Sequence, residues 1–120
     1  MAASAGAEWV AAYVRAWETN DPADIGALFT DDAVYEYRPD DPEAVRGRDA
    51  IVASWLESKD EAGTWAFDWR LLVDTPDLVI ITGRTEYPAE KDYDNLWVIR
   101  LAPDGRASRF TEWYMTRPRT

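Results

Sequence analysis

Residues 109–115 read Arg-Phe-Thr-Glu-Trp-Tyr-Met and follow the turn sequence Pro103-Asp104-Gly105. The alternation of side chains in this run predicts a β-strand in which Phe110, Glu112 and Tyr114 share one face. Glu112 then lies between two aromatic rings. If this face lines an interior, burial raises the pKa of the carboxyl group towards neutral pH, and Glu112 becomes the first candidate for chemistry. If the face meets water, Glu112 is an ordinary solvated residue.

The composition limits both the size of the fold and the chemistry. A chain of 120 residues predicts a single domain, residues 1–120, with one hydrophobic core. The sequence has no Cys and no His, which excludes disulfides, thiolate metal sites, zinc enzymes of the usual kind and Ser-His-Asp hydrolases. We expect neither a metal nor a cofactor. The acidic pairs 31–32 and 40–41 lack the spacing of a calcium loop.

The net charge of -10 argues against a nucleic-acid or anionic membrane partner. Residues 1–6 have neither the basic region nor the apolar core of a signal peptide, and no apolar run approaches ~18 residues. We therefore expect a soluble, cytoplasmic protein.

The first half of the chain has helical periodicity. Residues 7–19 carry an apolar stripe at i, i+4 and i+8, which predicts a helix that ends at Asn20-Asp21-Pro22. A short helix from residue 23 to residue 28 or 29 should follow, and Thr30-Asp31-Asp32 should end it. Residues 33–37 then alternate like a strand, and the Pro-containing residues 38–45 read as a loop. Asp49 is a plausible N-cap for a third helix over residues 50–58.

After Gly63 the period changes from 3.6 to 2. Residues 64–73, 78–87 and 93–101 alternate between apolar and polar positions and are separated by turn sequences, so they predict three strands before the last one. Helices followed by an antiparallel run of strands predict an α+β fold. Its expected form is a cone-shaped fold, with three N-terminal helices packed on a curved, mostly antiparallel sheet that encloses a pocket.

Four short motifs occur in the order found in the nuclear transport factor 2-like superfamily, including its SnoaL-like domains. They are Trp17-Glu18-Thr19-Asn20-Asp21, Leu28-Phe29-Thr30-Asp31-Asp32-Ala33, Gly47-Arg48-Asp49-Ala50-Ile51 and Glu112-Trp113-Tyr114. The chain resembles this superfamily over nearly its whole length. The resemblance implies a cone around a pocket, and dimerisation through the outer face of the sheet, as in many members.

By this resemblance the inward-facing pocket residues are mostly aromatic. Besides Tyr13, Trp65 and Glu112, the implied set is Trp17, Tyr35, Tyr37, Trp55, Phe67, Trp69, Tyr87, Asn95, Trp97, Phe110 and Tyr114. Compared with ketosteroid isomerases, Tyr13 takes the position of the oxyanion-hole tyrosine. Tyr37 stands where those enzymes have their aspartate base, and Trp97 replaces their second oxyanion donor. The Asp-Arg-Asp arrangement of the related epoxide hydrolases is missing.

Seven Trp, six Tyr and three Phe need either a thick core or an aromatic-lined cavity. Our hypothesis is a pocket for a small apolar or aromatic molecule. Glu112 would transfer a proton there, and Tyr13 or a neighbouring residue would stabilise an enolate-like intermediate. Isomerase, cyclase or dehydratase chemistry would follow. The alternative is a non-catalytic ligand-binding or dimeric scaffold protein in which Glu112 is structural, because fold does not determine function.

The outer face of the predicted sheet carries mixed charges, among them Asp68, Arg70, Arg84, Glu86 and Arg100. Such a face suits a dimer interface and plain solvent equally well. The family resemblance favours a homodimer.

Overall fold

The computed structural model describes residues 4–117, so the first half of the segment 1–6, on which the expectation about a signal peptide was based, lies outside the described residues. Within residues 4–117 the helices are α1 (Ala5–Thr19), α2 (Pro22–Gly26) and α3 (Arg48–Glu57). The strands are β1 (Phe29–Glu36), β2 (Val45–Arg46), β3 (Ala66–Asp74), β4 (Leu78–Glu86), β5 (Asp92–Leu101) and β6 (Ala107–Arg117). The predicted α+β class is confirmed.

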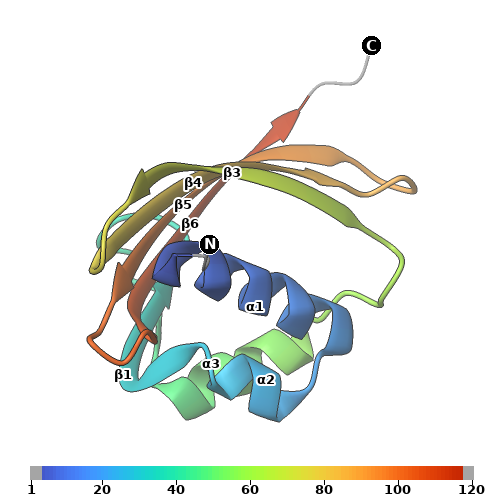
Figure 1. Cartoon of the computed structure of the whole chain (residues 1–120). Coiled ribbons are helices and arrows are strands. Elements are labelled where there is room, and N and C mark those ends of the chain that lie inside the picture. Colours follow the sequence, from blue (N-terminus) through green and yellow to red (C-terminus); the bar gives the residue numbers. More distant parts are fainter. Residues whose placement is uncertain (1–3, 118–120) are drawn as a thin grey trace.

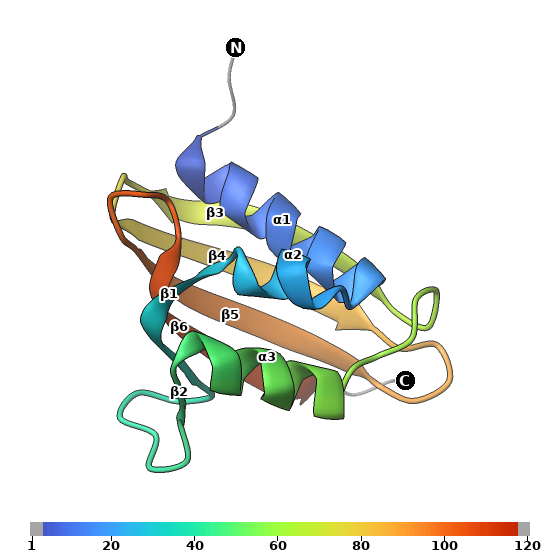
Figure 2. The ribbon, with the colours of Figure 1, turned by 90° about the horizontal axis from the view of Figure 1, so that it is seen from below.

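The strands form one curved sheet in the order β2-β1-β6-β5-β4-β3. All neighbouring pairs are antiparallel except β1 and β6, which run parallel. Figure 1 shows the three helices on the same concave side of the sheet, and Figure 2, seen from below, shows α1 and α3 in front of it. The parallel pair brings the end of the first strand beside the middle of the last one, with Glu36 opposite Thr111.

The first two helices begin and end at capping residues. The Ser4 side chain accepts a hydrogen bond from the Ala7 amide at 3.1 Å, and Asn20 ends α1 in the left-handed region at φ 53°. Asp21 then caps α2 by accepting a hydrogen bond from the Ala23 amide at 2.8 Å. These contacts explain why the predicted break at residues 20–22 is confirmed.

Several predicted boundaries are wrong. Helix α2 already ends at Gly26, and the predicted loop over residues 38–45 ends in the short strand β2. The strand β1 begins at Phe29 and not at residue 33. Its register against β6 shifts between Phe29 and Val34, and this irregularity accommodates residues 30–32, with Asp31 and Asp32 exposed to solvent. Asp49 is not the N-cap of α3: the cap is Gly47, at φ 91°, and Asp49 lies in the first turn. The Gly47 amide donates to the carbonyl of Ala33 at 2.8 Å, which anchors the start of the helix to β1.

The core lies between α1 and the concave face of the sheet. Trp9, Val10, Tyr13 and Ala16 of α1 are buried against apolar side chains of β4, β5 and β6, among them Ile81, Trp97, Ile99 and Phe110. The predicted alternation of β3 is confirmed. Its residues at positions 67, 69, 71 and 73 are half-buried, whereas those at 66, 68, 70 and 72 are exposed.

The convex face has the opposite character. Asp68, Arg70 and Arg100 are exposed there, as predicted. One buried carboxylate belongs to this face: Glu36 pairs with Arg109 at 2.9 Å and accepts a hydrogen bond from Thr111 at 2.7 Å. No helix within residues 4–117 is both long and apolar enough to cross a membrane.

Candidate active site

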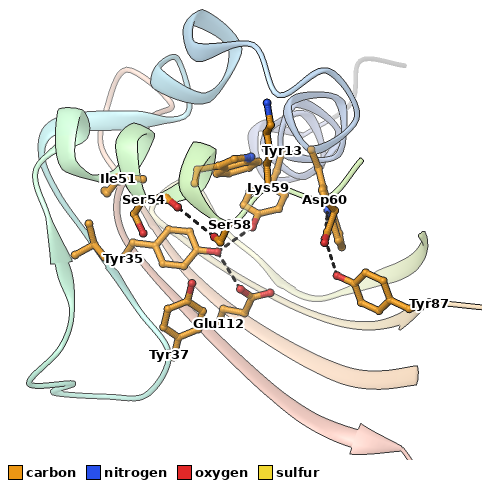
Figure 3. Close-up of a pocket in the computed structure, with 13 residues that line it drawn as sticks. Tyr13, Tyr35, Tyr37, Ile51, Ser54, Ser58, Lys59, Asp60, Tyr87 and Glu112 are labelled. Atoms are coloured by element: carbon orange, nitrogen blue, oxygen red, sulfur yellow. Dashed lines mark hydrogen bonds between the residues drawn. The ribbon is translucent and has the colours of Figure 1, made fainter. Parts of the chain in front are cut away.

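A cavity of about 160 Å³ opens between α1, α3 and the concave face of the sheet. It is open to solvent on one side, and its deep wall is made of aromatic rings (Figure 3). The lining residues are Tyr13, Trp17, Tyr35, Tyr37, Val45, Ile51, Ser54, Trp55, Ser58, Lys59, Asp60, Tyr87 and Glu112.

A chain of hydrogen bonds crosses this wall. The Tyr35 hydroxyl donates to Glu112 Oε1 at 2.9 Å, and the hydroxyls of Tyr13 and Tyr35 are also 2.9 Å apart. Tyr35 has a single hydroxyl proton, so Tyr13 must be the donor to Tyr35 when Tyr35 donates to the carboxylate. Figure 3 shows the Tyr35 hydroxyl between the other two groups. Helix α1, strand β1 and strand β6 each contribute one member.

The parallel pairing of β1 and β6 creates this arrangement. Tyr35 lies opposite Phe110 in the register, so both side chains face the interior and Glu112 follows two positions later on the same face. Phe110 is fully buried and its ring lies 4.8 Å from that of Tyr35. The packed rings therefore hold Tyr35 at the position from which it reaches Glu112.

Burial raises the pKa of Glu112, because the cavity wall gives its charged form less solvation than water does. The hydrogen bond from Tyr35 opposes this shift, and the negative charge of Asp60 adds to it. The buried Trp97 indole also lowers the pKa, although its Nε1 falls short of ordinary hydrogen-bond geometry with any described residue. No basic side chain within residues 4–117 forms an ion pair with Glu112.

The tyrosines beside the carboxylate are neutral hydrogen-bonding groups. Burial is the main reason why the pKa values of Tyr13 and Tyr35 lie well above 10.0, and the charge of Glu112 raises both further. Burial and then Glu112 also raise the pKa of Tyr37. None of these hydroxyls can act as a base near neutral pH, which leaves proton acceptance to the carboxylates.

Asp60 is a second carboxylate on this cavity, and the sequence pattern did not identify it. Its Oδ2 accepts hydrogen bonds from the Trp17 indole at 3.0 Å and the Tyr87 hydroxyl at 2.8 Å. Asn20 donates to the Asp60 backbone carbonyl at 2.8 Å, and its own side-chain oxygen accepts from the Trp55 indole at 3.1 Å. The only sequence signal was the number of ring donors, since buried indole and phenol groups require acceptors.

The structure brings seven of the fourteen residues that the resemblance places inward to this cavity. Both candidates for catalysis are among them, and the seven are Tyr13, Trp17, Tyr35, Tyr37, Trp55, Tyr87 and Glu112. Tyr37 lies at the open side, because 45% of its surface is exposed. Trp65, which the resemblance also turned inward, stacks on Trp17 at 3.7 Å outside the cavity.

The other six predicted pocket residues do not line the cavity, and this is a correction. Trp97 and Phe110 are fully buried beneath Tyr13, at ring distances of 4.5 and 5.3 Å, so they fill the cone. Phe67 stacks on Trp97 at 4.9 Å, and Trp69 packs against the same core. The remaining two, Asn95 and Tyr114, lie further along the sheet.

Those two residues are separated from the cavity for different reasons. Asn95 is buried, and its side-chain oxygen accepts a hydrogen bond from Thr85 at 2.8 Å, which links β5 to the neighbouring strand β4. Tyr114 has 55% of its surface exposed and makes edge contacts with Tyr37 and Tyr93. At this position β6 extends beyond the cavity, so a side chain on its concave face, such as that of Tyr114, is exposed to solvent.

A cone of helices on a curved sheet, with a carboxylate on an aromatic-lined cavity, defines a class of small pocket proteins. The family model of the SnoaL-like domain matches residues 10–116. The chain belongs to the SnoaL-like family, and the predicted relationship to the nuclear transport factor 2-like superfamily is confirmed. No curated protein matches this chain.

Solved structures share the fold at low sequence identity. An NTF-2 like protein of unknown function from Burkholderia xenovorans is 16% identical with a TM-score of 0.76, over 97% of this chain and 87% of that one. SalBIII, an epoxide hydrolase/cyclase-like enzyme in pyran ring formation in polyether salinomycin, is 18% identical with a TM-score of 0.68, over 90% and 88%. RV0760c from Mycobacterium tuberculosis, in complex with estradiol-17beta-hemisuccinate, is 14% identical with a TM-score of 0.61, over 94% and 95%.

The raised pKa of Glu112 has a consequence for stability. The folded state holds this proton more tightly than the unfolded chain, so its contribution to stability is present below the ordinary value of 4.5 and is lost as pH rises through the folded-state pKa. Gln resembles the protonated form at every pH. We therefore expect the free energy of unfolding of Glu112→Gln, relative to wild type, to increase as pH rises from 4.5 towards 8.

Urea unfolding of both proteins across this pH range measures the difference. Glu61→Gln is the matched control, because Glu61 is exposed and does not line the cavity. A difference for Glu112→Gln that stays flat or decreases with pH would contradict the raised pKa.

Proposed function

We propose that this protein binds a small ring compound in its cavity and that Glu112 moves a proton to or from it. The reaction class would be isomerisation, cyclisation or dehydration without a cofactor. The observation that carries this proposal is the row of hydrogen bonds from Tyr13 through Tyr35 to Glu112, at the wall of an open aromatic cavity. It supplies a base with a raised pKa and hydroxyl groups within reach of the same ligand.

The size of the cavity limits the ligand. An apolar cavity of about 150 Å³ holds one benzene molecule. The 160 Å³ found here therefore suit a single six-membered ring, with substituents passing through the open side. A four-ring steroid such as the ligand of RV0760c would need more room than the described side chains leave.

The two hydrogen bonds from Tyr13 to Tyr35 and from Tyr35 to Glu112 connect the base with its hydrogen-bond donors. While Glu112 is ionised, the hydroxyl proton of Tyr35 is held by the carboxylate and that of Tyr13 is held by Tyr35. When Glu112 takes a proton from a substrate carbon, it binds the Tyr35 proton less strongly. Tyr35 or Tyr13 can then turn a hydroxyl towards the negative charge that develops on the substrate oxygen.

The second candidate function is ligand binding without catalysis. It is favoured by the same contacts, because Glu112 ties β6 to β1 and α1 and could serve only to hold the cone in shape. A measurement of proton transfer separates the two candidates.

Exchange of the hydrogens next to the carbonyl of cyclohexanone in D₂O, followed by NMR, tests proton removal directly. Glu112 would take a hydrogen from carbon, exchange it with solvent and return deuterium. We expect wild type to accelerate the exchange and Glu112→Gln to lose about 10²- to 10⁴-fold of that acceleration, the usual contribution of a general base. Calorimetry should find cyclohexanone bound to both proteins.

The control Glu61→Gln should keep the wild-type exchange rate. If wild type binds cyclohexanone but does not accelerate the exchange, the non-catalytic function is supported. If Glu112→Gln accelerates the exchange as much as wild type does, Glu112 is not the base. Failure of cyclohexanone to bind at all would contradict the proposed pocket.

We also propose that the protein is a cytoplasmic homodimer assembled through the convex face. Support comes from an apolar strip on that face: Trp113 is 42% exposed and borders a hollow with Leu96 and Val98. The lack of Cys suits a reducing compartment. Analytical ultracentrifugation should give twice the 13.7 kDa chain mass, and Trp113→Glu should shift the species towards monomer. A wild-type monomer at high concentration would contradict the dimer.

A further inference from the structure

Two carboxylates face the same small cavity from different elements. Glu112 projects from β6, whereas Asp60 follows the end of α3 and lies on the other side of the cavity, next to Tyr87 (Figure 3). Lys59 is the one basic residue in the lining, and its side chain is exposed. No ion pair within residues 4–117 joins Lys59 to either carboxylate.

The negative charges in this cavity act on one another. The charge of Asp60 raises the pKa of Glu112, and the charge of Glu112 raises that of Tyr37. The whole chain has a net charge of -10, which adds a field that attracts cations and repels anions. A positive group between the carboxylates would lower the energy of both, whereas an anionic ligand would meet two like charges.

The remaining wall presents aromatic faces. Six rings line the cavity, and hydrogen bonds hold the polar atoms of five of them. Trp17 and Tyr87 donate to Asp60, and Trp55 donates to Asn20. The other two are the tyrosines whose hydrogen bonds lead to Glu112. Because their polar atoms are already used, these rings can offer a ligand only the faces that no other ring covers. Trp65 covers one face of Trp17. Such faces attract ammonium groups through the ring quadrupole.

Asp60 also keeps an oxygen for a ligand. Both side-chain hydrogen bonds that it receives from described residues end on Oδ2, and no residue within 4–117 donates to Oδ1. The carboxylate is therefore held in place by two donors while its second oxygen can accept another N–H group.

We propose that the ligand of this cavity is an organic cation, namely a single ring that carries a protonated amine. The ammonium group lies between Asp60 Oδ1 and the faces of the aromatic rings, and the ring of the ligand reaches towards Glu112. This inference rests on the proposed binding function and adds the chemical class of the ligand. Asp60 is then a residue that determines specificity, distinct from the proton-transfer role of Glu112.

Three probes of nearly equal shape test the charge preference: benzylamine, which is protonated at pH 7, neutral benzyl alcohol, and anionic benzoate. We expect isothermal titration calorimetry to find benzylamine bound about tenfold more tightly than benzyl alcohol, from cation–π attraction and the contact with Asp60. Benzoate should bind most weakly. Added salt should weaken the binding of benzylamine more than that of benzyl alcohol.

Asp60→Asn is the informative variant, because an amide oxygen can still accept from Trp17 and Tyr87 while the charge is lost. It should reduce the preference for benzylamine over benzyl alcohol to about twofold or less, with little change in the affinity for the alcohol. Glu61→Gln removes the same charge one residue away and outside the cavity, and it should keep the wild-type preference. Thermal unfolding of both variants checks that they fold.

The outcomes separate this inference from the proposed function. Equal or tighter binding of benzyl alcohol or benzoate by wild type would overturn the cation preference and leave the pocket in place. An unchanged preference in folded Asp60→Asn would overturn the role of Asp60. If none of the three probes binds, the proposed pocket fails and the inference fails with it.

Discussion

The hydrogen bond from Tyr35 to Glu112 joins the two strands whose parallel pairing closes the site, and the rest of the cavity depends on it. Tyr35 is held by Phe110 on one side and by Tyr13 on the other. The bond stabilises the charged form of Glu112 against the burial that disfavours it. The balance between these two effects determines whether the carboxyl group holds a proton near neutral pH. Both effects arise from the same packing of rings.

The aromatic residues divide into two groups, one that fills the core and one that lines the open side of the cavity. Trp97, Phe110 and Phe67 fill the narrow part of the cone and exclude water from beneath Tyr13. The rings nearer the open side keep a polar edge on Asp60 or Asn20 and leave their faces to the cavity. The packed rings of the core therefore position Tyr13 and Glu112, while the rings at the open side provide the surface for a ligand.

The family resemblance indicated which face of the last strand points inward. Period-2 alternation predicted the strands and placed Phe110, Glu112 and Tyr114 together on that face, because successive side chains of a strand point to opposite sides. It could not predict where the cavity ends along a strand, so Tyr114 was placed in the pocket and proved exposed. Asp60 was missed because it lies in a polar segment without periodicity, where only tertiary contacts with Trp17 and Tyr87 reveal its place. The start of β1 was missed for a similar reason, since a shift of register accommodates its acidic residues.

Glu112 holds a proton more tightly than an ordinary glutamate, and the hydrogen bond from Tyr35 moderates this effect. Titration of the Glu112 carboxyl carbon by NMR, in wild type and in Tyr35→Phe, measures both quantities. We expect a wild-type pKa above 4.5 and a still higher pKa in Tyr35→Phe, because the variant loses the hydrogen bond that favours the charged form. A wild-type pKa at or below 4.5, or a lower pKa in Tyr35→Phe, would contradict it.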